Sequence, residues 1–201
     1  MQETVKIPTT RNGMTTFNLL LKASEACFFE KGYHGTTVAD ITQKAGVAAG
    51  TFYLYFPSKM SLYRHLLNEL SRDIRKEIAS KIDPSLKRSD QERAGIKAFL
   101  EYAIENPHMY QIIWESLYID RSLFQSYYDA FAKRYVKGLK GAQEKGEIGP
   151  LDLEIVAYIL MGITNFMGLK IILEMGQNKS KIDDVIDAIM EILNHGLFKT
   201  V

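Results

Sequence analysis

The 201-residue sequence is poor in the features that stabilise secreted proteins or span membranes. Cysteine occurs once, at Cys27, which excludes an intramolecular disulfide, and we expect a buried structural thiol. The N-terminal residues contain no apolar segment of the signal-peptide kind, which predicts a cytoplasmic protein. A membrane span needs about 20 apolar residues. The uncharged run 155–169 has only 15 residues, and we expect it to form a helix buried on most sides.

Catalytic and metal-binding motifs are also lacking. The four histidines are scattered and form neither an HExxH nor an HxxxH pair, and the sequence contains no nucleophile elbow or phosphate-binding loop. We therefore predict no catalytic residue, no metal site and no cofactor.

Helical patterns with clear start and stop signals fill the chain, and no alternating strand pattern interrupts them. We predict an all-α protein of about nine helices. The first ends at Gly32, the fifth begins with a capping box at Ser89 to Glu92, and Asn106 caps the sixth. The predicted ranges are 15–31, 38–45, 48–55, 58–82, 89–105, 107–118, 121–145, 152–175 and 180–195.

Residues 36–59 have the pattern of two short helices around one glycine turn. Thr37 and Asp40 form a capping box, and Gly46 stands where a left-handed residue would end the first helix. The second helix runs to about Tyr55, before Pro57. This pattern predicts a helix-turn-helix and therefore a DNA partner. An ordinary helical hairpin, with its tyrosines used for packing, is the alternative.

The second helix has an outer face of small and hydroxyl-bearing side chains, which suit close approach to a duplex. Glycine within a helix costs roughly 1 kcal/mol relative to alanine, so Gly50 indicates that bulk is unwelcome there. We expect Lys59, at the start of the next helix, to pair with a phosphate. The predicted DNA-binding residues are Thr37, Ala48, Ala49, Gly50, Thr51, Tyr53, Tyr55 and Lys59.

About the first 65 residues resemble the DNA-binding domain of the TetR family. The resemblance lies in Phe28 to Tyr33, Thr37-Val38, Ile41, Ala45-Gly46-Val47, Gly50 to Tyr53, Tyr55-Phe56, Lys59 and Leu62. It implies a dimeric, one-component transcriptional regulator, usually a repressor, whose C-terminal domain binds a small molecule that releases the operator. That family often has serine or a larger polar residue at Ala48 and Ala49. Recognition of the DNA sequence should therefore depend more on Thr51, Tyr53 and the shape of the groove.

We divide the chain into an N-terminal arm with a three-helix helix-turn-helix domain, residues 1–57, and an effector-binding and dimerisation domain, residues 58–201. The predicted helix 58–82 connects them. The net charge is only +1, yet residues 1–72 hold eight Lys and Arg against five Asp and Glu. Lys6 and Arg11 of the arm could contact phosphate or the minor groove, or could lie free in solvent.

The last two predicted helices carry apolar residues suited to a partner helix. The final helix has a narrow seam at heptad-like spacing, and glycine in the helix before it permits close approach. We predict a four-helix homodimer interface, with burial inside one subunit as the alternative. The predicted dimerisation residues are Ile159, Gly162, Ile182, Val185, Ile186, Ile189 and Leu193.

Ten of the twenty-two aromatic residues fall between positions 99 and 135. Aromatic stripes usually form a core, but the TetR resemblance implies an effector pocket in the same helices, for an apolar or amphipathic ligand. The predicted ligand-binding residues are Phe99, Tyr102, Tyr110, Trp114, Tyr118, Tyr127, Phe131 and Phe166.

A second pattern resembles TetR members tied to fatty-acid metabolism, which makes a long-chain acyl compound our leading hypothesis for the effector. It comprises Asn106-Pro107, Trp114, Asp120, Tyr127-Tyr128, Gly146-Glu147-Ile148, Asp152 and Gly162. The predicted partners are a double-stranded DNA operator, a small-molecule effector and a second copy of the chain, with no membrane. The competing class is an α-helical ligand-binding protein or enzyme without specific DNA binding.

Overall fold

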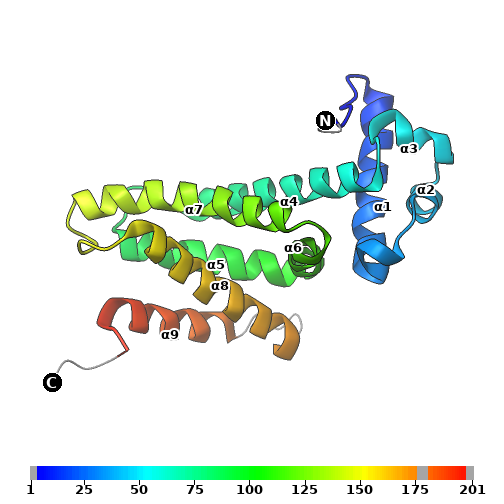
Figure 1. Cartoon of the computed structure of the whole chain (residues 1–201). Helices are drawn as coiled ribbons and strands as arrows, with labels where there is room; N and C mark the ends of the chain where they lie inside the picture. The colour runs from blue at the N-terminus through cyan, green and yellow to red at the C-terminus, as the bar shows by residue number, and fades with distance from the viewer. Residues whose placement is uncertain (1–3, 176–180, 198–201) are drawn as a thin grey trace. The chain divides into compact units, whose positions relative to one another are not determined.

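The structure is a computed structural model that describes residues 4–175 and 181–197. Within these residues the regular elements are nine α-helices (Figure 1). They are α1 (Arg11–Gly35), α2 (Val38–Ala45), α3 (Ala49–Tyr55), α4 (Lys59–Lys81), α5 (Arg88–Glu105), α6 (His108–Ile119), α7 (Arg121–Glu144), α8 (Leu153–Met175) and α9 (Ile182–His195). The all-α prediction is confirmed.

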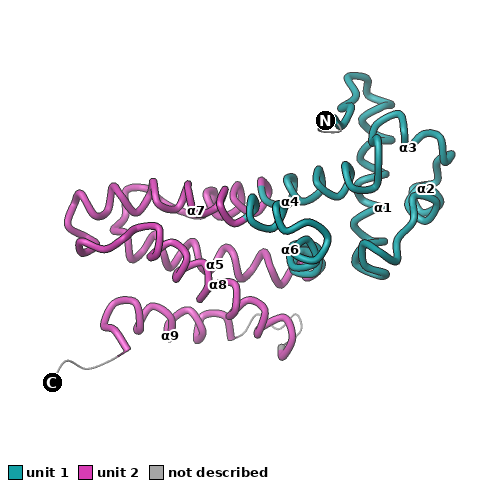
Figure 2. Tube along the Cα trace, in the orientation of Figure 1, with its two compact units in different colours: residues 1–71, 108–127 teal, residues 72–107, 128–201 magenta. Residues whose placement is uncertain are grey.

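Packing divides the chain into two compact units, which Figure 2 colours separately. Residues 1–71 and 108–127 form the first unit, and residues 72–107 and 128–201 form the second. Helix α6 therefore packs in the same unit as α1, α2 and α3, although it follows α5 in the chain. These two units are defined by packing alone. The division into a DNA-binding domain, residues 1–57, and an effector-binding domain, residues 58–201, stays a prediction.

The first unit has an aromatic core beneath the helix-turn-helix. Phe17 of α1 stacks on Phe56 with ring centroids 4.9 Å apart, and Phe52 packs against Phe56 at 5.6 Å. Phe28 meets Tyr63 of α4 edge to face at 5.2 Å. All five side chains are buried. Their burial explains how the short helices α2 and α3 are held in place, since a seven-residue helix such as α3 is unstable alone.

In the second unit, α5 packs against α8 and α9. Two ion pairs fasten α5 to α9, Arg93 to Asp187 at 2.5 Å and Lys97 to Asp183 at 2.7 Å. A separate apolar cluster joins α7 and α8 through Leu139, Ala157 and Leu160, with Leu193 of α9 packed beside it.

Helix α1 is longer than predicted. Thr10 caps its start, accepting the Gly13 N–H at 3.2 Å, so the helix begins at Arg11. Gly32 does interrupt helical geometry, with φ 69° and ψ 170°, but a final turn follows it to Gly35. The glycine is therefore a break within α1.

The capping box predicted for the start of α5 is wrong, although the helix begins at Arg88, one residue from the predicted start. No side chain caps this helix at Lys87, and Glu92 does not fold back as the end of a capping box. Instead Glu92 is buried, accepting hydrogen bonds from Arg88 Nη2 at 2.5 Å and from the Tyr135 hydroxyl. A carboxylate beside a guanidinium gains more there than in an exposed cap.

Asn106 also has a different role from the predicted one. It is the C-cap of α5, and its Nδ2 donates to the Tyr102 carbonyl at 2.9 Å. It therefore ends α5, and α6 begins at His108.

Helix α8 is less buried than expected. By length and composition, residues Leu153–Glu174 are apolar enough to cross a membrane, and only 33% of that window is buried. The core helix of a globular domain passes the same test, so composition alone does not assign α8 to a bilayer. Large apolar side chains are nevertheless exposed along it, namely Ile155, Tyr158, Ile159, Phe166 and Leu173.

Candidate nucleic-acid interface

The predicted capping box at the start of α2 is confirmed. Thr37 Oγ1 accepts the Asp40 N–H at 3.1 Å, and Asp40 Oδ2 accepts the Thr37 N–H at 2.8 Å. Hydrogen bonds from Lys31 and then Thr37 hold the pKa of Asp40 far below its ordinary value. The exposed Thr37 hydroxyl is thus already hydrogen-bonded to Asp40. A hydrogen bond from this hydroxyl to DNA would have to form in addition to the bond with Asp40 or replace it.

The turn depends on Gly46, which has φ 70° and ψ 32°. This left-handed geometry ends α2, because the Gly46 N–H donates to the Gln43 carbonyl at 3.2 Å and the Val47 N–H to the Thr42 carbonyl at 3.0 Å. A side chain at position 46 would be strained by the positive φ. The chain can therefore start α3 within three residues of the end of α2.

The outer face of α3 is accessible. Ala48, Ala49, Gly50 and Tyr53 are exposed, with 57% of Tyr53 open to solvent. Nothing lies within 4 Å of the position that a Cβ on Gly50 would occupy. No packing inside the protein therefore requires a glycine at position 50.

Thr51 and Tyr55 are only half-buried on the same short helix. Tyr55 meets Phe17 edge to face at 5.8 Å, so part of its ring supports the core. The Tyr55 carbonyl accepts the Lys6 N–H at 2.8 Å, which ties the N-terminal arm to the end of α3. The side chains of Lys6 and Arg11 are exposed.

Lys59 has an internal role that the sequence did not reveal. Its ammonium donates to the carbonyls of Tyr33 and Thr36 at 2.5 and 2.6 Å and lies 4.2 Å from the centre of the Tyr33 ring. Burial lowers the pKa of this ammonium. Lys59 thus holds the end of α1, and its contact with phosphate stays a prediction.

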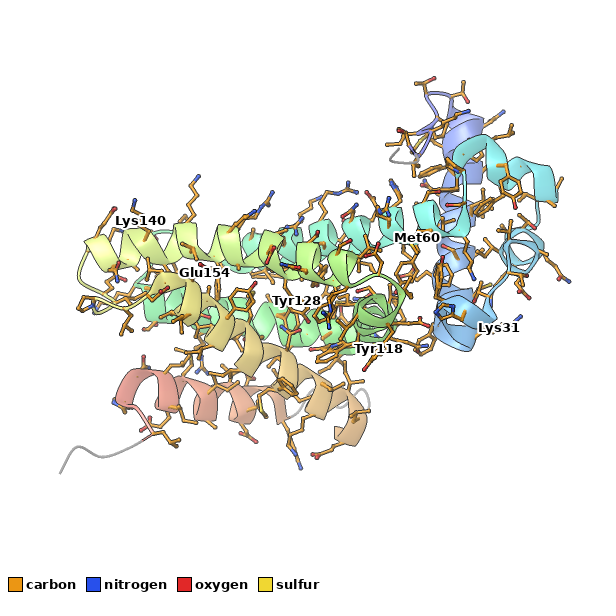
Figure 3. All side chains as sticks on the ribbon, viewed as in Figure 1. Lys31, Met60, Tyr118, Tyr128, Lys140 and Glu154 are labelled. Carbon is orange, nitrogen blue, oxygen red and sulfur yellow. The ribbon has the colours of Figure 1, made fainter. Side chains whose placement is uncertain are left out.

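Two ion pairs fix α2 against α1. Lys31, labelled in Figure 3, lies 2.6 Å from Asp40, and Lys44 pairs with Glu30. Part of the positive charge counted at this end of the chain is therefore neutralised locally. The candidate interface is therefore an exposed surface of mostly small residues more than a strongly basic one.

The predicted ligand-binding residues are divided between the two units. Phe99, Tyr110 and Tyr127 are buried, and Tyr102, Trp114 and Phe131 are partly buried. Tyr118, labelled in Figure 3, is 84% exposed, and Phe166 is 63% exposed. An open hollow of about 680 Å³ lies elsewhere, at the turn between α7 and α8, and is lined by Gln143, Gly146, Ile148, Gly149, Pro150 and Leu151.

The predicted dimerisation residues do not share one exposed surface. Ile182, Ile186 and Ile189 are already buried within the chain, on a helix that packs against α5. Val185 and Leu193 are half-buried, and Leu193 joins the α7–α8 cluster. Gly162 is half-buried, whereas 54% of Ile159 is exposed. The seam of α9 is therefore mainly an internal contact.

Sequence reasoning missed two charged clusters. Arg88, Glu92 and Tyr135 form one in the second unit, where burial and then the Glu92 charge raise the pKa of Tyr135. Glu115 of α6 forms the other, accepting the Tyr33 N–H at 2.7 Å. Tyr135 lies 43 residues from Glu92 and Glu115 lies 82 residues from Tyr33, so neither contact has a local spacing signal, whereas Arg88 and Glu92 are only four residues apart. Among the residues that the structure describes, no group of three His, Cys, Asp or Glu could hold a metal ion.

Comparison with known proteins agrees with this geometry. Residues 20–66, which span most of α1 through the first part of α4, match the family described as bacterial regulatory proteins, tetR family. The HTH-type transcriptional repressor DhaR of Mycobacterium sp. is 23% identical over 186 residues, covering 87% of this chain and 90% of DhaR.

Solved structures share the fold over nearly the whole chain. The fatty acid degradation regulator FadR from Bacillus halodurans superposes with a TM-score of 0.80 at 18% identity, covering 92% of this chain and 97% of its own. FadR from Bacillus subtilis, in complex with stearoyl-CoA, has a TM-score of 0.73 at 18% identity, covering 90% and 100%. With its capped helix-turn-helix and nine described helices, this chain belongs to the TetR family of DNA-binding transcriptional regulators.

Proposed function

We propose that this regulator is a cytoplasmic repressor that binds a pseudo-palindromic operator through the outer face of α3 and is released by a small apolar or amphipathic effector. The observation that carries the proposal is the exposed surface Ala48-Ala49-Gly50, in which no internal contact requires the glycine. Thr51 and Tyr53 supply the hydroxyl groups that read base edges, and Lys59 contacts phosphate.

A dimer would present two such helices to successive major-groove faces, about 34 to 36 Å apart. Support comes from the apolar stripe of α8, which we define as Ile155, Ile159, Gly162, Phe166, Leu169 and Leu173. These residues repeat at spacings of four and three, as a helix-pairing seam does. Four of them, all except Gly162 and Leu169, are exposed large apolar side chains. The dimer contact proposed here therefore runs along α8, with the outer residues of α9 beside it.

The effector class follows from the aromatic residues of α5 to α8 and from the fatty-acid pattern in the sequence. A long-chain acyl compound fits both, and the Bacillus subtilis FadR structure holds stearoyl-CoA. A coupling free energy of about 1 to 3 kcal/mol between the effector and operator sites would lower operator affinity roughly 5- to 150-fold.

The test is a titration of stearoyl-CoA into the complex of the full chain with a duplex that the protein itself selects from a random library. We expect release of the duplex and a raised thermal midpoint of the free protein, because a ligand that binds the folded state stabilises it. Coenzyme A without the acyl chain is the matched control and should do neither. If stearoyl-CoA leaves both operator affinity and thermal stability unchanged, the acyl effector is wrong.

A further inference from the structure

Helix α6 docks on α1 through a polar stripe, all within the first packing unit. His108, Gln111 and Glu115 follow one another at spacings of three and four, so they share one face of the helix. His108 Nε2 lies 2.5 Å from Glu25, and Gln111 Nε2 donates to the Phe28 carbonyl at 3.2 Å. Glu115 is the last of the three and reaches the point where α1 breaks.

At that break the backbone leaves helical geometry. Gly32 has φ 69°, and the Tyr33 N–H donates to Glu115 Oε1 at 2.7 Å. A Cβ at position 32 would lie only 2.8 Å from the same oxygen. Glycine is therefore favoured by the positive φ, and a side chain at position 32 would displace the Glu115 carboxylate from this place.

Lys59 holds the other side of the same corner. Its ammonium binds the carbonyls of Tyr33 and Thr36, while Glu115 takes the Tyr33 N–H. The two side chains therefore clamp both polar groups of one residue, Tyr33, from two different helices. Their opposite charges also favour each other, since the Glu115 charge opposes the effect of burial on the pKa of Lys59.

This corner sets the position at which α2 begins. Thr36 is buried, and its hydroxyl donates to the Gly32 and Cys27 carbonyls at 2.7 and 3.0 Å. Thr37, the next residue, is the N-cap of α2, and α3 follows after one turn. Tyr33 and the N-cap of α2 are therefore joined by a short segment in which the Thr36 hydroxyl is bonded to α1.

The environment of the Glu115 carboxylate is also energetically unfavourable in one respect. Its second oxygen, Oε2, is buried without a hydrogen bond among the described atoms. A buried acceptor without a donor is costly, so packing stability alone does not account for a carboxylate here.

We propose that Glu115 is a positioning residue for operator binding: from α6 it fixes the corner between α1 and α2 and thereby the placement of α3 on DNA. The inference rests on the proposed function, because it assumes that α3 reads an operator. It assigns a DNA-binding role to a residue outside the matched range 20–66.

The test compares full-length variants on the duplex selected by the native protein and on a scrambled duplex. Glu115→Ala removes the acceptor and should weaken specific binding about tenfold, in line with the loss of a charge-assisted hydrogen bond. Binding to the scrambled duplex should change little, because phosphate contacts supply it. Glu115→Gln keeps an acceptor oxygen and should restore most of the affinity. Amide hydrogen exchange at Tyr33 should rise in the alanine variant and return toward normal with glutamine.

Glu25→Ala is the matched control, because it breaks another polar contact between α1 and α6 but leaves the corner intact. It should keep operator affinity within about threefold. Glu115→Met fills a similar volume without an acceptor and replaces the alanine variant if that one does not fold. Native-like operator affinity in a folded Ala or Met variant overturns the inference and leaves the proposed function standing. If the native protein prefers no duplex, the proposed function fails and this inference with it.

Discussion

Gly50 lies on the exposed side of a seven-residue helix, where an added Cβ would meet no atom within 4 Å. Glycine is a poor helix former because it loses more backbone entropy on folding than any other residue. A residue that weakens α3 and gains no internal contact is best explained by what α3 touches outside the protein.

Replacement of Gly50 should therefore separate stability from DNA binding. We expect Gly50→Ala to raise the free energy of unfolding by up to about 1 kcal/mol. Gly50→Gln should also fold, but should weaken specific operator binding tenfold or more, because its side chain separates α3 from the groove. Chemical denaturation and duplex titration measure the two effects. Gly141→Ala, on α7 with equally open space, is the control that should gain stability without loss of binding.

Substitutions at Lys59 and Thr51 should affect different properties of DNA binding, namely overall affinity and sequence preference. Lys59→Ala should weaken binding to all duplexes and lower the slope of log affinity against log salt by about one. Because Lys59 also holds two carbonyls of the α1–α2 corner, this variant should lose about 1 to 3 kcal/mol of stability and, like Glu115→Ala, a further part of its specific binding. Thr51→Ala should instead relax sequence preference.

Duplex titrations at several salt concentrations, with Lys76→Ala as an exposed-lysine control on α4, distinguish these effects. The same behaviour in the Lys59 and Thr51 variants would contradict the division between positioning and reading residues.

At the scale of elements, α2 depends on a cap whose charge can be titrated. The folded pKa of Asp40 lies below its ordinary value of 3.8, so its contribution to stability is present above the unfolded pKa. It is lost as the pH falls below about 4 toward the folded pKa.

The acid limb of a stability-against-pH curve should therefore be shallower for Asp40→Asn than for the native chain. Asp73→Asn is the control, because Asp73 is a half-exposed acid on α4 with only a long 4.0 Å contact to Arg72. Identical acid limbs for the native chain and Asp40→Asn would show that the cap is not ionised in the way described.

Elements were predicted well where their signals are local. Thr37 and Gly46 lie within a few residues of the groups they bond, so both ends of α2 could be found from spacing. The role of Glu92 at the start of α5 could not, because Glu92 binds Tyr135, 43 residues away. Glu115 escaped notice for the same reason, since its partner Tyr33 lies 82 residues earlier.

At the scale of the whole molecule, the solvent exposure of each apolar side chain shows which helix-pairing patterns are already packed inside the chain. Periodicity identified apolar faces on the last two helices, but it could not tell which face α5 covers. Ile186 is fully buried while Ile159 is 54% exposed, although both fit a helix-pairing pattern. Within the second packing unit, the apolar stripe of α8 is therefore the more exposed of these two patterns.

Ile159→Glu should convert the proposed dimer into monomers, because a charge buried in an apolar interface without a partner is strongly unfavourable. Operator affinity should then fall by a hundredfold or more, since two linked recognition helices bind far more tightly than one. Light scattering measures the mass. Leu86→Glu, at an exposed apolar residue outside α8, should change neither property. A native protein that is already monomeric at micromolar concentration would contradict the proposed interface.

The most direct test of sequence-specific binding through α3 is selection of bound duplexes from a random library. The selected duplex and a scrambled control are then titrated at two salt concentrations. We expect a pseudo-palindromic duplex with half-sites about one helical turn apart, preferred about a thousandfold or more over the control. No enrichment, with equal and equally salt-sensitive binding to both duplexes, would contradict the proposal that α3 reads an operator.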